Sequence, residues 1–182
     1  VYSHDARVLA KPSASARTQK RLARFQLVHV LETKGTGHSV FHRIDEDQWV
    51  ADRDIRRPTV SSAPASITGQ SKWIDIELAS QTLVAYEGSK PVYAAMVSTG
   101  RGPQGSEFAT PKGEHRIWVK LVGSNMDNLE DENANNYYSI EDVPYVQYFS
   151  KGVGLHSAFW HSAFGRVKSH GCVNLPPIDA QW

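Results

Sequence analysis

A single cysteine, Cys172, stands in the segment "SHGCVNL" near the C-terminus of the chain. Only the thiolate form of cysteine attacks carbonyl carbons well, and a neighbouring imidazole or a ring of backbone amides favours that form. Three histidines lie within the 16 residues before the cysteine: His156 precedes it by 16 residues, His161 by 11 and His170 by two. The segment therefore holds the parts of a thiol nucleophile with an imidazole base.

Gly171 separates His170 from Cys172. Residues two apart on an extended chain point to the same side, so these two side chains are expected to share a face. A glycine also permits a bend that a Cβ atom would obstruct, which lets the surrounding backbone N–H groups point at one spot. Such a spot would stabilise the oxyanion of an acyl-transfer intermediate.

Two other interpretations of the same residues remain open. A lone cysteine is often an inert buried thiol. The four residues His156, His161, His170 and Cys172 could also bind zinc, which takes four nitrogen or sulfur ligands. No pair among them has a familiar zinc-ligand spacing and there is no second cysteine, so we expect no metal. Acyl transfer through a thiol and an imidazole also needs no organic cofactor.

The composition restricts the partners. The 20 Lys and Arg against 19 Asp and Glu, with no block of like charge, give no reason to expect nucleic acid or an anionic membrane as a partner. No apolar run approaches the roughly 20 residues of a membrane span. The chain begins at Val1 and ends at Trp182 in what looks like a starting helix, so we expect a C-terminally truncated piece of a longer protein.

Alternating apolar residues predict short strands that would position the cysteine segment. "WIDIEL" and "QTLVAYEGSKPVYAAMVSTG" predict a β-meander that opens a domain over residues 73–182. "YVQYF" and "GVGLH" predict buried strands that lead into the cysteine segment. Between Leu121 and Pro144 the chain is acidic and rich in Asn, and we expect a long loop there, of the kind that often forms a lid.

The first part of the chain predicts a separate small domain. Residues 1–57 carry short alternating stretches such as "FQLVHVLE" and "SVFHRI", which are typical of a small barrel. In length and in its closing "WVADRDIR" this part resembles the Src-homology-3-like modules of bacterial cell-wall proteins. The segment "PTVSSAPASITGQSK" over residues 58–72 has no apolar periodicity and predicts a linker.

The segment "HSAFW" followed by "SHGCVNL" is similar to the catalytic signature of L,D-transpeptidases (the YkuD-type domain). "TPKGEHRIW" and "EDVPYVQYF" also resemble parts of that family, and the resemblance covers residues 71–182. It implies a mostly β fold, a β-sandwich with a mixed sheet, that acts on peptidoglycan stem peptides and is a target of carbapenems. It also implies a periplasmic or extracellular, cell-wall-associated protein involved in wall biogenesis and cell shape.

The resemblance assigns roles position by position. Cys172 matches the nucleophile, His156 matches its base, and the backbone carbonyl of Ser157 matches the group that orients the imidazole. His170 and Gly171 match positions that shape the oxyanion pocket. The remaining expected site residues contact substrate or support the loop: Ser169 and Asn174 brace it, Arg166 could meet a substrate carboxylate, and His161 and Tyr145 line the pocket wall.

The expected reaction is the attack of Cys172 on the carbonyl of the third residue of a stem tetrapeptide. The terminal D-Ala leaves, and an amine acceptor then resolves the thioester. Two alternatives stay open. Water in place of the amine would make the protein an L,D-carboxypeptidase, and a domain without activity would be a silent wall-binding module. The module at residues 1–57 is expected to bind the wall or to act as a spacer.

Overall fold

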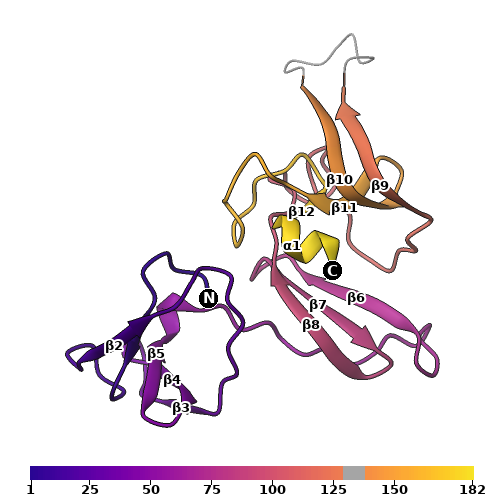
Figure 1. The fold of residues 1–182 in the computed structure, drawn as a ribbon. Coiled ribbons are helices and arrows are strands. Elements are labelled where there is room, and N and C mark those ends of the chain that lie inside the picture. The colour runs from indigo at the N-terminus through magenta and orange to yellow at the C-terminus, as the bar shows by residue number, and fades with distance from the viewer. Residues whose placement is uncertain (129–137) are drawn as a thin grey trace. The chain divides into compact units, whose positions relative to one another are not determined.

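The computed structural model describes residues 1–128 and 138–182 (Figure 1). Strands hold 40% of the residues and helices 5%, so the expected mostly β fold is confirmed. The chain divides into two compact units, Val1–Met96 and Val97–Trp182, which are described separately below.

The first unit opens with a five-stranded sheet in the order β2-β1-β5-β4-β3, in which all the pairs are antiparallel. Closure of this sheet into a Src-homology-3-like barrel stays a prediction. No helix or strand lies between residues 55 and 71, where the linker is expected. The five strands are β1 (Arg7–Leu9), β2 (Thr18–Arg21), β3 (Glu32–Lys34), β4 (Phe41–Asp45) and β5 (Gln48–Ala51).

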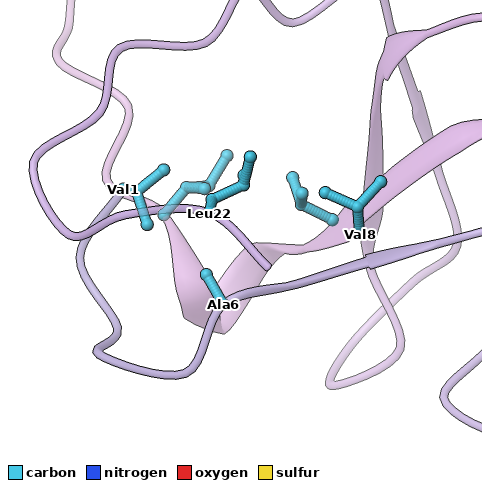
Figure 2. Close-up of a cluster of buried hydrophobic side chains, with 6 residues drawn as sticks. Val1, Ala6, Val8 and Leu22 are labelled. Atoms are coloured by element: carbon cyan, nitrogen blue, oxygen red, sulfur yellow. The ribbon is translucent and has the colours of Figure 1, made fainter. Parts of the chain in front are cut away.

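A cluster of small aliphatic side chains forms the core of this sheet region (Figure 2). β1 and β5 lie at the middle of the strand order, so their side chains are covered most completely. Burial of apolar area of this kind supplies most of the favourable free energy of folding. The six buried residues of the cluster are Val1, Ala6, Val8, Leu22, Val50 and Ile55.

A second, three-stranded antiparallel sheet in the first unit has the order β6-β7-β8. Its strands are β6 (Lys72–Glu77), β7 (Thr82–Glu87) and β8 (Lys90–Met96). The central strand β7 is almost entirely buried, which explains why it reads as the continuous apolar run "LVAY". Gly88, with a φ of 58°, turns the chain from β7 into β8, and the predicted meander is confirmed.

The second unit contains a four-stranded sheet in the order β12-β11-β10-β9. β11 and β12 run parallel while the other pairs are antiparallel, so the expected mixed sheet is confirmed. The packing of sheets into a sandwich stays a prediction. The strands are β9 (Val119–Asp127), β10 (Ser139–Ser150), β11 (Val153–Ser157) and β12 (Val173–Leu175).

The long loop expected between Leu121 and Pro144 is wrong over the described residues. β9 continues to Asp127 and pairs with β10 from Ser139 onward, so most of the described residues of the stretch form an antiparallel ribbon. The backbone ladder holds this ribbon while most side chains of β9 stay exposed, and the sequence therefore lacks the apolar alternation that marks a half-buried strand. Residues 129–137, the centre of the expected lid, lie outside the described residues.

The helix expected at the C-terminal end is confirmed as α1 (Pro177–Gln181). Its first residue is a proline, which is tolerated there because the N–H at that position has no partner in a helix. Within residues 1–128 and 138–182, no helix is long and apolar enough to cross a membrane.

Candidate active site

The parallel pairing of β11 with β12 brings the cysteine beside a histidine. Leu155 pairs with Val173 and His156 with Asn174, so Cys172, one residue before β12, comes opposite Gly154. Side chains two apart on a strand share a face, which puts His156 and Cys172 on the same face of neighbouring strands. The Sγ atom of Cys172 lies 3.9 Å from the carbonyl oxygen of Gly152.

The turn before Cys172 depends on a glycine. Gly171 has a φ of +126°, a conformation that residues with a Cβ atom rarely adopt. The hydroxyl of Ser169 accepts a 3.1 Å hydrogen bond from the N–H of Gly171 and donates a 2.5 Å bond to the carbonyl of Cys172. The hydroxyl of Thr110 donates a 2.6 Å bond to the carbonyl of Gly171. These bonds fix the bend that the sequence predicted, and they support a bracing role for Ser169.

His156 is 3% exposed, and its Nδ1 lies 2.8 Å from the carbonyl oxygen of Ser157. A carbonyl oxygen only accepts, so Nδ1 carries the proton and Nε2 keeps a free lone pair in the neutral ring. Burial lowers the pKa of His156, and the hydrogen bond to Ser157 opposes this shift only in part. The imidazole is therefore neutral near pH 7, as a base must be.

The thiol of Cys172 is also neutral before reaction. Burial raises its pKa, and a hydrogen bond with the backbone of Gly154 only partly offsets that effect. A thiol of this kind becomes nucleophilic only when a base takes its proton. This chemistry requires a proton acceptor on the same face as the thiol.

His161 is tied to Asn174 rather than left open to solvent. Its Nδ1 accepts a 3.1 Å hydrogen bond from the N–H of Ala163, so the proton of the neutral ring lies on Nε2. Nε2 is 2.9 Å from Nδ2 of Asn174, and since both would be donors we turn the amide over, so that the otherwise unpartnered Oδ1 accepts from Nε2–H. Burial lowers the pKa of His161, which keeps the ring in this neutral state.

Sequence reasoning missed a group of side chains around His170. Arg101 Nη2 lies 2.5 Å from His170 Nε2, and the ring of Phe108 lies 4.9 Å from the imidazole. The ring centroid of Tyr138 lies 5.7 Å from that of His170, and burial raises the pKa of Tyr138. Arg101 stands directly after the apolar run that ends in "STG", which is the only signal in the sequence that could have drawn attention to it.

A further aromatic residue that the sequence did not single out lies against the candidate base. The ring of Trp160 stacks on His156, with centroids 5.8 Å apart and an angle of 23° between the planes. This contact covers part of the imidazole and contributes to the burial that lowers its pKa.

Two expected substrate residues have no placement that defines a role. Arg166 is exposed, and its backbone N–H donates to the carbonyl of Ala163 at 3.2 Å. Tyr145 lies on β10 with a φ of 57°. In the register of β10 it is Tyr148 that pairs with Gly154, the residue beside the thiol. The substrate-binding roles of Arg166 and Tyr145 stay predictions.

The zinc interpretation finds no ligand set. Nδ1 of His156 is bonded to Ser157, His161 uses both ring nitrogens, and Nε2 of His170 is bonded to Arg101. No group of three or more His, Cys, Asp or Glu side chains positioned for a metal occurs in the part of the chain that the structure describes. The geometry suits a thiol and imidazole pair.

Comparison with known proteins matches this chain to a family. The family model described as the L,D-transpeptidase catalytic domain (YkuD) matches residues 71–182. The candidate L,D-transpeptidase YciB of Bacillus subtilis (strain 168) is 25% identical over 144 residues, which are 71% of this chain and 67% of the relative.

Solved structures agree with this match. L,D-transpeptidase 3 from Mycobacterium tuberculosis, in complex with a faropenem-derived adduct, aligns with a TM-score of 0.54 and 25% identity over 78% of this chain and 70% of that one. LdtMt1 in complex with imipenem aligns with a TM-score of 0.55 and 23% identity, over 83% of this chain and 74% of that one. The C442S mutant of the Enterococcus faecium L,D-transpeptidase aligns with a TM-score of 0.50 and 22% identity over 60% of this chain. The aligned part spans 43% of that longer chain.

Proposed function

This chain belongs to the family of L,D-transpeptidase catalytic domains, and on that premise we propose that Cys172 is the nucleophile of a peptidoglycan L,D-transpeptidase. The observation that carries the proposal is the fixed tautomer of His156. Its Nδ1–H is bonded to the carbonyl of Ser157 at 2.8 Å, which leaves Nε2 as an acceptor on the face that Cys172 shares.

The first step forms a thioester. As Sγ of Cys172 attacks the carbonyl of the third residue of the stem tetrapeptide, Nε2 of His156 takes the thiol proton. The tetrahedral oxyanion then collapses, the C–N bond to the terminal D-Ala breaks, and the imidazolium returns its proton to the leaving amine. The carbonyl of Ser157 stabilises the imidazolium while the proton is on the ring.

The bend at Gly171 supports an oxyanion pocket. The N–H of Gly171 itself donates to Ser169 at 3.1 Å, so we assign the pocket to the backbone N–H of Cys172. His170 borders this pocket rather than serving as the base, because its Nε2 already accepts a hydrogen bond from Arg101.

The second step transfers the acyl group to an amine of a second stem or of another wall-anchored acceptor. His156 deprotonates the amine, which attacks the thioester, and Sγ leaves and regains its proton. No metal or organic cofactor takes part in this scheme. Because the family acts on peptidoglycan peptides, we place the protein at the cell wall, outside the cytoplasm.

We also propose a division of labour along the chain. Residues 1–57 would form a wall-binding or spacing module, residues 58–72 a linker and residues 73–182 the catalytic domain. The support is the five-stranded sheet that ends at Ala51 and the start of the family match at residue 71.

The acceptor is tested by giving the purified protein a tetrapeptide donor with and without an excess of a D-amino acid amine and analysing the products by mass spectrometry. We expect the exchanged tetrapeptide in which the D-amino acid replaces D-Ala. Tripeptide as the main product in both reactions would identify an L,D-carboxypeptidase. No turnover and no thioester would identify a silent binding module.

A further inference from the structure

A guanidinium group is built into the rim of the candidate site. Arg101 Nη2 lies 2.5 Å from His170 Nε2, and its guanidinium carbon lies 5.6 Å from the centroid of Phe108. The same phenyl ring lies 4.9 Å from the imidazole of His170. Two contacts to rigid groups therefore restrict a side chain that would otherwise be one of the most mobile on a protein surface.

The backbone ties this arginine to the loop that carries the nucleophile. Gly100 and Ser169 form a parallel β-bridge, and the N–H of Arg101 donates to the carbonyl of Ser169 at 3.1 Å. Ser169 in turn bonds to the carbonyl of Cys172. Arg101 is thus fixed to the loop of the nucleophile, although it is far from that loop along the chain.

The hydrogen bond decides where the positive charge lies. A guanidinium group only donates, so Nε2 of His170 accepts and the imidazole is neutral, with its proton on Nδ1. Burial and the charge of Arg101 both lower the pKa of His170, while the carboxylate of Glu107 raises it. The cation of this pair is Arg101.

Within residues 1–128 and 138–182, no carboxylate forms a close ion pair with Arg101. Glu107 is the acidic side chain that influences His170, but no salt bridge joins it to Arg101. His170 takes one of the five N–H donors of the guanidinium, and the planar fork suits a carboxylate in a bidentate pair.

We propose that Arg101, held in place by His170 and Phe108, binds a carboxylate of the acyl-donor peptide and so directs its scissile carbonyl to Cys172. That the bound molecule is the acyl-donor peptide rests on the proposed function. The attraction of an anion to the thiol by Arg101 is independent of that function. Two carboxylates of a stem tetrapeptide are candidates: the terminal one of D-Ala and the side-chain one of diaminopimelate.

The first test uses two alkylating agents that are similar in size and differ in charge. Iodoacetate and iodoacetamide both react by attack of Sγ on the CH₂ group, with formation of a C–S bond and release of iodide. Because Cys172 is the only thiol in the chain, intact mass reports its alkylation directly. The ratio of the two rates cancels the thiolate fraction, so it measures only the preference for an anion.

We expect Arg101→Gln to lower the ratio of iodoacetate to iodoacetamide rates by about tenfold, as removal of one nearby cation does. Arg101→Lys should keep most of the ratio because it keeps the charge. Arg116→Gln, which removes an exposed arginine of the same unit, is the matched control and should leave the ratio unchanged. An Arg101→Gln ratio equal to that of the wild-type protein would overturn the proposal.

The second test identifies the carboxylate. Thioester formation is compared for the tetrapeptide, its C-terminal amide and a tetrapeptide with lysine in place of diaminopimelate. Arg101→Gln and Arg101→Lys should both lower kcat/KM for the tetrapeptide, and have no effect with the donor that lacks the recognised carboxylate. An equal loss with all three donors would overturn the proposal. A protein that forms no thioester with any donor would instead contradict the proposed function, while the alkylation ratio still decides the role of Arg101.

Discussion

The hydroxyl of Thr110 donates a 2.6 Å hydrogen bond to the carbonyl oxygen of Gly171, the residue before the cysteine. The same hydroxyl accepts a 2.9 Å bond from the N–H of Gly100. One buried side chain therefore joins the segment "TPKG" to the bend that presents the nucleophile, although the two lie far apart in the sequence. The bend is held by more than its own local hydrogen bonds.

Thr110→Val removes this hydroxyl at nearly constant shape and leaves the two backbone groups unpaired. We expect a loss of about 1–3 kcal/mol in the free energy of unfolding, because each buried polar group loses its partner. The rate of acylation should fall by more than the decrease in the fraction of folded protein explains. Chemical denaturation and single-turnover acylation measure the two effects, and Thr110→Ser, which keeps the hydroxyl, is the control. Full acylation by Thr110→Val would show that the bond does not position the nucleophile.

Gly171→Ala tests the backbone conformation of the bend. A Cβ atom at this position would meet no atom closer than 3.4 Å, so the cost comes from the φ of +126° and not from a clash. Backbone strain of this kind costs about 1–3 kcal/mol, and we expect the variant to be destabilised and slow in acylation. Gly123→Ala in β9 is the matched control, since the nearest atom to its Cβ would be 3.8 Å away. Equal stability of the two variants would contradict the account.

His156 and His161 differ in what their ring nitrogens do. His156 keeps Nε2 as an acceptor, whereas both nitrogens of His161 are bonded to other groups. We expect His156→Ala to lower the single-turnover acylation rate by about 10²- to 10⁴-fold, the usual loss of a general base. His161→Ala should have a smaller effect, mainly through Asn174. A larger loss in the His161 variant, with both proteins folded, would reassign the base.

The pH profile follows from the buried state of His156. Its pKa is lowered in the folded protein, so the ring stays neutral and active below its ordinary pKa of about 6.5. The unfolded chain binds this proton first, so stability decreases as the pH falls below about 6.5. We expect the acid limb of acylation below pH 6.5, and a shallower decrease of stability in His156→Gln. An acid limb with its midpoint above pH 6.5 would contradict the assignment of a buried, neutral His156.

The sequence singled out candidate site residues but not the contacts around them. Cys172 and His156 could be proposed as a pair because cysteine is rare in this chain and the motif is local. Gly171 could be predicted as a bend, since only glycine adopts its φ with ease. These features depend on neighbours in the sequence.

Contacts between distant segments could not be read in this way. Arg101 reaches His170 because a β-bridge pairs Gly100 with Ser169. Thr110, which bonds to the N–H of Gly100, also reaches the carbonyl of Gly171. The ribbon of β9 and β10 was mistaken for a loop because backbone hydrogen bonds stabilise it, and such bonds leave no apolar pattern in the sequence. Contacts and strand pairings between such distant segments are set by the tertiary structure and not by the local sequence.

The most direct test of the whole account is the intact mass of the protein after incubation with imipenem, followed by peptide mapping. The account predicts one covalent adduct, located on Cys172, and none on Cys172→Ala under the same conditions. The variant should remain folded, because replacement by alanine removes only the half-buried sulfur atom. An adduct that persists in Cys172→Ala, or a wild-type protein that forms none with either imipenem or the tetrapeptide, would contradict the assignment of Cys172 as the nucleophile.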